Sequence, residues 1–167
     1  MIENKVDKSG LLSFDLNDLV PKGERAIVDV KDFMFEGIMI KEKDFREKIK
    51  TYDWSQYENK FVGITCSEDA IIPLWVYMLL ASSLLPFAKL VIRGNKSHLE
   101  GAILKRAIEN LDTKNFENQR VIVKGCGGEI PESAYIAITS ILQPVVKSLM
   151  FGEACSTVPV FKNTESK

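Results

Sequence analysis

The sequence predicts an α/β fold, a three-layer domain with a mostly parallel sheet of about five strands and an internal βαβ duplication. Two observations carry this prediction. Short apolar runs alternate with segments of helical periodicity, which is typical of βαβ units. Several residues also recur at a fixed offset. The chain has 167 residues, of which 46% are hydrophobic and 27% charged, the balance of an ordinary globular domain. We therefore expect one domain over residues 1–167.

The elements follow from local pattern. In residues 25–30, Ala26, Val28 and Val30 would lie on one side of a strand, and Ile27 and Asp29 on the other, which indicates a strand. Residues 35–40 are a second apolar run, so an N-terminal hairpin-like pair is expected to add an edge or a dimer surface. Further strands are expected at 60–65, 89–93, 120–124 and 147–151. Helices are expected at 42–52, 69–85, 97–111 and 131–142. Residues 1–24 are taken as a lead-in and 163–167 as a loose tail.

Residues 70–88 carry no charge over 19 residues, close to the ~20 that a bilayer-spanning helix needs. Pro73, Ser82, Ser83 and Pro86 interrupt the stretch, and no basic cluster flanks it. A crossover helix buried on both sides has the same composition. We expect such a helix and no membrane partner.

Charge and the N-terminus limit the function classes. The formal net charge of −1 supplies no basic excess for phosphates, so no nucleic-acid partner is expected. The first residues lack the apolar segment of a signal peptide, which favours a cytoplasmic protein. Three cysteines in a reducing compartment are more plausibly free, metal-bound or reactive than disulfide-paired.

The duplication is expected over residues 57–94 and 116–152. Tyr57-Glu58-Asn59 recurs as Phe116-Glu117-Asn118 at an offset of 59, and Cys66 recurs as Cys126 at 60. Seven further residues recur at an offset of 58: Pro73, Tyr77, Ser82, Leu84, Pro86, Lys89 and Gly94. The alternative is that any two βαβ units share proline and glycine at their turns.

The cysteines are the candidate site. Cys66, Cys126 and Cys155 each follow a predicted strand, and the carboxyl ends of parallel strands form one edge of a sheet. Three thiolates can bind zinc with a fourth ligand, or three corners of an iron–sulfur cluster. Candidate fourth ligands are Glu153, Asp69 and His98. The alternative is inert packing, since no C-x-x-C pair is present and buried cysteine often acts as a small hydrophobe.

No other motif identifies a cofactor or a catalytic residue. Gly125-Cys126-Gly127-Gly128 matches neither dinucleotide nor Walker patterns, and no G-x-S-x-G sequence is present. Catalytic residues are therefore unassigned, and whether the protein is an enzyme stays open.

Longer motifs resemble one bacterial family, catalogued as domain of unknown function 2480. They include Thr65-Cys66-Ser67 followed by Asp69-Ala70-Ile71-Ile72-Pro73, Lys124-Gly125-Cys126, and the ending Gly152-Glu153-Ala154-Cys155-Ser156-Thr157-Val158-Pro159. Upstream, Asp53-Trp54-Ser55-Gln56-Tyr57 is also similar, so the resemblance covers nearly the whole chain. All three cysteines fall inside family motifs, whereas the resemblance implies no ligand role for His98.

The resemblance adds one functional expectation. Members of the family tend to be encoded beside iron–sulfur cluster assembly genes, which favours a cluster or iron over zinc. The first hypothesis is thus a metal- or iron–sulfur-binding accessory protein that interacts with iron–sulfur assembly proteins. The second is a thiol enzyme or sulfur carrier that uses Cys66 or Cys126. The third is a non-catalytic interaction module with inert cysteines, for which a homodimer is one form.

Overall fold

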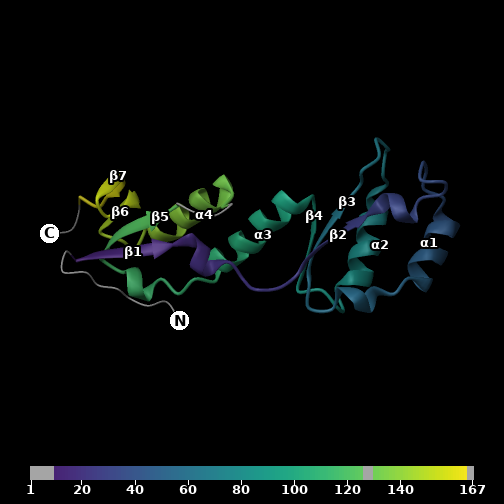
Figure 1. The fold of residues 1–167 in the computed structure, drawn as a ribbon, viewed down its shortest axis with the longest axis horizontal. Helices are drawn as coiled ribbons and strands as arrows, with labels where there is room; N and C mark the ends of the chain where they lie inside the picture. Colours follow the sequence, from purple (N-terminus) through teal and green to yellow (C-terminus); the bar gives the residue numbers. More distant parts are fainter. Residues whose placement is uncertain (1–9, 126–129, 165–167) are drawn as a thin grey trace. The chain divides into compact units, whose positions relative to one another are not determined.

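The computed structural model describes residues 10–125 and 130–164. The contacts divide the chain into two compact units. Unit 1 comprises Met1–Pro21 and Leu104–Lys167, and unit 2 comprises Lys22–Ile103. Figure 1 follows the chain from β1 in unit 1 into β2 in unit 2, and from α3 back into β5. Unit 2 is thus an insertion, in sequence, between the first strand of unit 1 and the rest of that unit.

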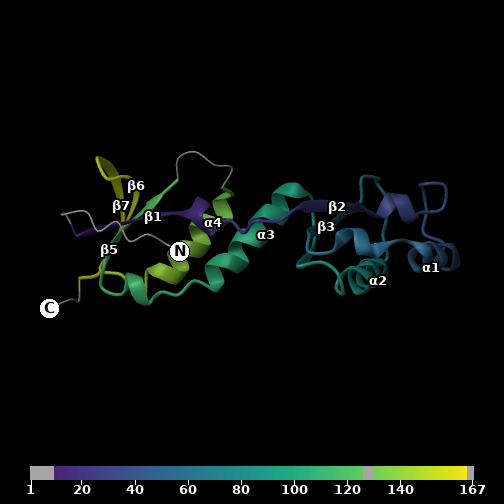
Figure 2. The ribbon, with the colours of Figure 1, turned by 60° about the horizontal axis from the view of Figure 1, so that its bottom comes forward.

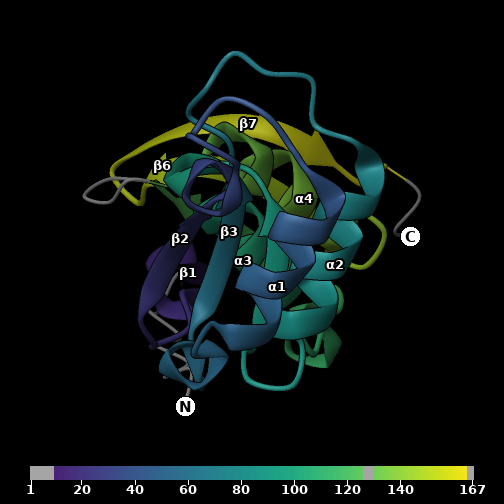
Figure 3. The ribbon, with the colours of Figure 1, turned by 90° about the vertical axis from the view of Figure 1, so that its right-hand side faces the viewer.

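Unit 2 is built on a parallel three-stranded sheet in the order β2-β3-β4. The strands are β2 (Arg25–Asp29), β3 (Phe61–Thr65) and β4 (Leu90–Arg93), and the helices between them are α1 (Glu42–Thr51) and α2 (Leu74–Leu84). Figures 2 and 3 show both helices beside the same face of β2 and β3. The crossover from β3 through α2 to β4 is the βαβ unit that the sequence pattern predicts.

Buried residues explain why unit 2 has helices on both faces of its sheet. Val62 and Ile64 of β3 pack in one cluster with Val76, Leu80 and Leu84, which follow each other along one side of α2. The opposite face of the sheet carries Phe61, which packs with buried residues of the first half of α3 (Lys96–Glu109): Leu99 and Ile103. Unit 2 is therefore a three-layer arrangement with the sheet in the middle.

Unit 1 is built on a four-stranded sheet in the order β1-β5-β6-β7. Its strands are β1 (Leu11–Asp15), β5 (Arg120–Lys124), β6 (Ser148–Glu153) and β7 (Ser156–Lys162), and its crossover helix is α4 (Glu132–Leu142). The pairs β1–β5 and β5–β6 are parallel, and β7 returns antiparallel to β6. The buried stripe of α4 consists of Ala134, Ile138 and Leu142, which pack with Val121 and Val123 of β5.

The two units repeat one order of elements. In each unit the order along the chain is a strand, a one-turn 3₁₀ helix, an α-helix, a second one-turn 3₁₀ helix, a strand, the crossover helix and a strand. The 3₁₀ helices are Val30–Phe33 and Trp54–Tyr57 in unit 2, and Leu16–Leu19 and Lys114–Phe116 in unit 1. Asn59 and Asn118 both have positive φ, 60° and 57°. Their backbone N–H groups donate to the carbonyls of Phe87 and Val145, at 2.9 and 2.8 Å. An origin by duplication stays a prediction.

The α/β class and the mostly parallel strand arrangement are confirmed. The parallel strands are shared between two sheets: β3 is the middle strand of one, and β5 is an inner strand of the other. Two strands were missed, β1 inside the predicted lead-in and β7 after the last predicted strand. The apolar run at 35–40 forms only one isolated bridge, Phe35 with Met39.

The charge-free stretch forms the short helix α2, which begins at Leu74 and not at Asp69. Pro73 occupies the position before it, where the restricted φ of proline suits a helix start. None of the helices in the described part of the chain has the length and apolar character that a bilayer crossing requires.

Truncating the buried stripe of α2 is expected to destabilise the protein. Leu80 is 0% exposed, so Leu80→Ala removes contacts on all sides and should lower the free energy of unfolding by about 2–5 kcal/mol. The control is Met78→Ala on the same helix, where the side chain is 73% exposed and the expected change is within about 0.5 kcal/mol. Urea unfolding measures both. Equal effects for the two variants would contradict the assignment of the buried face.

Candidate functional site

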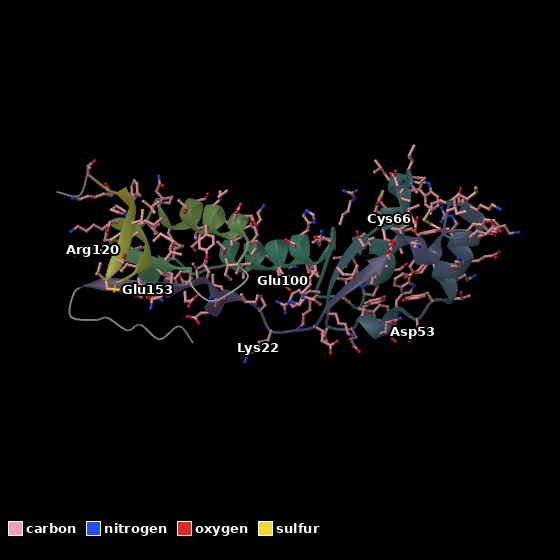
Figure 4. The ribbon with its side chains drawn as sticks, turned by 45° about the horizontal axis from the view of Figure 1, so that its top comes forward. Lys22, Asp53, Cys66, Glu100, Arg120 and Glu153 are labelled. Carbon is pink, nitrogen blue, oxygen red and sulfur yellow. The ribbon has the colours of Figure 1, made fainter. Side chains whose placement is uncertain are left out.

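A cavity of about 570 Å³ lies at the carboxyl edge of the unit 2 sheet. Residues at the ends of β3 and β4 line it, together with the loop that leads into α2; they include Thr65, Cys66, Glu68, Tyr77, Arg93 and Gly94. Figure 4 labels Cys66 at this place. The carboxyl edge of a parallel sheet is where open α/β folds usually form their binding sites.

Cys66 is the first residue after β3, and its half-buried side chain faces this cavity. Its Sγ donates to the carbonyl oxygen of Glu68 at 3.5 Å. The N–H of Ala70 donates to the same carbonyl at 3.0 Å, which closes a tight turn directly after the cysteine. The thiol is thus positioned by its own loop and remains accessible from the cavity.

Asp29, at the end of β2, fixes that loop to the neighbouring strand. Its Oδ1 accepts hydrogen bonds from the backbone N–H of Lys31 at 3.0 Å and of Ser67 at 3.1 Å. Burial raises the pKa of Asp29, but hydrogen bonds from Ser67 and Lys31, with the charge of Lys31, lower it by more. The ionised carboxylate therefore anchors the residue next to Cys66.

An ion pair closes the outer side of the loop. The Lys31 Nζ contacts the Glu68 Oε1, and the hydrogen bond to Glu68, with the Glu68 charge, raises the pKa of Lys31. Both side chains are largely exposed, so the pair adds little stability. Its consequence for the site is that the Glu68 carboxylate is already neutralised by Lys31.

Arg93, the last residue of β4, supplies the positive charge of the cavity. Its guanidinium carbon lies 5.4 Å from the centroid of the Tyr77 ring. In the described part of the chain, no ion pair uses Arg93. A guanidinium held over an aromatic ring, with its N–H donors available, is suited to a carboxylate or phosphate. The arrangement therefore joins a thiol and an anion-binding group in one cavity.

The start of α2 adds to this electrostatic setting. No side chain caps the helix at Pro73, and Ile72 and Leu74 line the cavity. Uncapped N–H groups and the helix dipole favour negative charge at a helix start. An anionic ligand beside Arg93 would be stabilised there.

The structure gives the local surroundings of each predicted fourth ligand. Asp69 is exposed in the loop after Cys66. His98 is exposed in the first turn of α3, where its Nδ1 accepts from the N–H of Asn95 at 3.4 Å and its N–H donates to the Asn95 Oδ1 at 3.1 Å. His98 thus takes part in a helix-start hydrogen-bond pair. Glu153, at the end of β6, pairs with Lys124 at 3.4 Å.

The other two cysteines belong to unit 1. Cys155 is exposed in the turn between β6 and β7, and Cys126 lies outside the described residues. The strands that precede Cys126 and Cys155 in sequence, β5 and β6, are neighbours, whereas β3 before Cys66 belongs to the other sheet. Within residues 10–125 and 130–164, no three His, Cys, Asp or Glu side chains gather as a metal site.

The family model described as "Protein of unknown function (DUF2480)" matches residues 1–163. The chain belongs to this family. Neither the comparison with curated proteins nor that with solved structures gave a match. The resemblance seen in the sequence is thereby confirmed for this DUF2480 protein.

Sequence reasoning on this DUF2480 protein found Cys66 and missed its neighbours. Arg93 was placed at the end of a predicted strand but given no role, although a charged residue that closes an apolar strand before Gly94 lies at the same edge as Cys66. Asp29 could have been found in the same way, as the last residue of β2. Tyr77 entered the sequence analysis only as a repeat match, and only the structure shows its ring beside the Arg93 guanidinium.

The anchoring role of Asp29 predicts a pH-dependent effect of Asp29→Asn. Because the folded pKa lies below the unfolded value, the stability from this carboxylate is complete above about pH 4 and is lost as pH falls through the folded pKa. Wild type should therefore exceed the variant in urea unfolding at pH 7, and the gap should shrink at pH 3. Asp69→Asn, at an exposed position, is the control and should match wild type at both pH values. A gap that grows on acidification would contradict the assignment.

Proposed function

We propose that this protein is a cytoplasmic sulfur carrier in which Cys66 accepts sulfane sulfur from a small anionic persulfide. The observation that carries the proposal is the presence of two groups in one cavity of about 570 Å³: the Cys66 thiol, and the Arg93 guanidinium, which forms no ion pair with another described residue. A cavity of that volume accommodates a small metabolite. The family's association with iron–sulfur assembly supports such a role, because cluster assembly consumes sulfane sulfur.

The proposed step balances without an added oxidant or reductant. The Cys66 thiolate attacks the outer sulfur of a persulfide R–S–SH and forms a new S–S bond at Cys66. The donor's S–S bond breaks, and R–S⁻ leaves with the electron pair and takes up the proton released by the Cys66 thiol. Arg93 binds the carboxylate of the donor and brings its outer sulfur to the thiol. The N-terminus of α2 stabilises the negative charge on the sulfur atoms.

Glutathione persulfide tests the step directly. After incubation and alkylation, mass spectrometry of the Cys66 peptide should show the addition of one sulfur atom. Arg93→Gln removes the charged donor group and should slow the transfer about tenfold, the effect of losing one charge-assisted hydrogen bond. Lys96→Gln, an exposed charge change close by in the sequence, is the matched control and should leave the rate unchanged. Equal sulfur addition at Cys155, or full speed in Arg93→Gln, would contradict the proposal.

A second candidate is a metal- or iron–sulfur-binding accessory protein with Cys66, Cys126 and Cys155 as ligands. One observation favours part of it. β5 and β6 are neighbouring strands, so the segments that follow them leave the same edge of one sheet, and the Lys124–Glu153 pair joins the two strand ends. The described residues do not assemble such a site by themselves, because Cys155 and Glu153 have no third ligand beside them there. The candidate therefore depends on Cys126.

Metal and acid-labile sulfide analysis of protein purified without air separates the two candidates. Iron with sulfide, lost in Cys126→Ser and in Cys155→Ser, would support the cluster. Metal retained in all three single cysteine-to-serine variants would exclude cysteine ligation. The remaining hypothesis, a non-catalytic interaction module, stays a prediction, as do a homodimer and iron–sulfur assembly proteins as partners.

A further inference from the structure

The cavity that contains Cys66 is lined by charges of both signs. Among the described residues that line it, Glu68 and Arg93 are charged and the others are not. Unit 1 has a cavity of the same volume, about 570 Å³, between α4 and the ends of β5 and β6, and none of the described residues that line it is charged. Discrimination between ligands by charge in the unit 2 cavity therefore depends on Glu68 and Arg93.

The register of the sheet places the thiol and the guanidinium on one face. Ile64 of β3 pairs with Arg93 of β4, and side chains alternate between the two faces along a strand, so Cys66 continues the side of Ile64. Ile64 belongs to the buried cluster that includes α2, and Cys66 packs against that cluster. A ligand that reaches the Cys66 sulfur is therefore on the same face as the Arg93 guanidinium.

Lys31 limits what the second charge of the cavity can do. It lies outside the lining, in the 3₁₀ turn after β2, and its Nζ contacts the Glu68 Oε1. The two side chains are 47% and 39% exposed, so water screens the pair and its effect on a ligand is modest. The Glu68 carboxylate is nevertheless engaged by one cation before a ligand enters.

A positive group on a ligand is disfavoured in this cavity for two reasons. It would share the cavity with the Arg93 guanidinium, whose charge no ion pair with a described residue offsets. The carboxylate of the described lining, Glu68, is shared with Lys31, and much of the remaining wall is apolar, as at Ile72 and Leu74. A carboxylate in the same place meets the guanidinium, which suits it in charge and shape.

We infer that the Cys66 cavity takes sulfur donors that carry a carboxylate, and no ammonium group, near the reacting sulfur. Lys31 is a specificity-determining residue that enforces this preference by occupying Glu68. The inference deepens the proposed function and rests on it for the class of donor. The sulfur-transfer step is the one given above, and only the charged group on R differs between donors. Persulfides of short mercapto acids are thereby favoured over persulfides of aminothiols.

Two donors of similar size and opposite charge measure the preference: the persulfides of 3-mercaptopropionate and of cysteamine. Alkylation and mass spectrometry give the rate of sulfur addition at Cys66 for each donor. The ratio of the carboxylate rate to the ammonium rate is divided by the same ratio for 2-mercaptoethanol, an uncharged thiol. We expect a normalised ratio of about five or more in the wild-type protein. A normalised ratio of one or below overturns the inference.

Lys31→Gln tests the role of Lys31, and it keeps the backbone N–H that donates to Asp29. With Glu68 released, the normalised ratio should fall about three- to fivefold, the most that an exposed ion pair can account for. Lys31→Gln/Glu68→Gln removes both charges and should restore the wild-type ratio. Lys43→Gln, at an exposed lysine of α1, is the matched control and should leave the ratio unchanged. Equal slowing of both donors in Lys31→Gln would show a purely structural role and overturn the assignment.

Methanethiosulfonates separate this inference from the proposed function, because they need no sulfane sulfur. The cysteine thiolate attacks the sulfenyl sulfur of the 2-sulfonatoethyl or 2-aminoethyl reagent, a disulfide forms, and methanesulfinate leaves with the electron pair. The sulfonate reagent should be preferred at Cys66, and less so in Lys31→Gln. That result without sulfur addition from either persulfide would overturn sulfur transfer alone. Sulfur addition without a charge preference in either assay would overturn the inference alone.

Discussion

The burial of one helical stripe against one strand face determines where both cavities form. In unit 2, Val76, Leu80 and Leu84 are all fully buried against the sheet, and in unit 1 Ala134, Ile138 and Leu142 hold the equivalent positions. These residues fix the position of each crossover helix over its own sheet. The chain must then leave the central strand, turn at its carboxyl end and enter the helix within a few residues. The turn therefore lies at the sheet edge, beside the helix start.

On this common backbone, the chemistry of each edge depends on a few exposed or half-buried side chains. Unit 2 places a thiol after the central strand and a guanidinium at the end of the next strand. Unit 1 places Gly125 and Phe151 at the corresponding positions. The buried stripes are intact in both units, so the difference between the two edges lies in these few side chains.

Local patterns in the sequence predicted most of the elements because the central strands and crossover helices have strong apolar periodicity. β7 was missed because Ser156, Thr157 and Pro159 indicate a turn; in the structure Pro159 lies on an edge strand, next to a shift of register, where a missing N–H is tolerated. The division into two sheets was not predictable, since strand order depends on contacts between residues far apart in the chain. β1 pairs with β5, more than 100 residues later in sequence, and nothing within Leu11–Asp15 specifies that partner.

The same limit applies to the site. The sequence correctly placed Cys66 at the end of a strand. It grouped all three cysteines on the expectation of a single sheet, whereas β3 and β5 belong to two sheets, and the shared site stays a prediction. The repeat also suggested that Cys126 matches Cys66, whereas the strand ends align Cys66 with Gly125. That shift by one residue separates a cysteine at the strand end in unit 2 from a glycine in unit 1. Periodicity alone does not resolve such a shift in a loop.

The proposed function requires that the cavity around Cys66 attracts anions to a thiol. Alkylation of the native protein by iodoacetate and by iodoacetamide, reagents of similar size that differ in charge, measures this at each cysteine by mass spectrometry. We expect the ratio of the iodoacetate rate to the iodoacetamide rate to be several-fold higher at Cys66, beside Arg93, than at Cys155, in the turn after Glu153. An equal or lower ratio at Cys66 would contradict it.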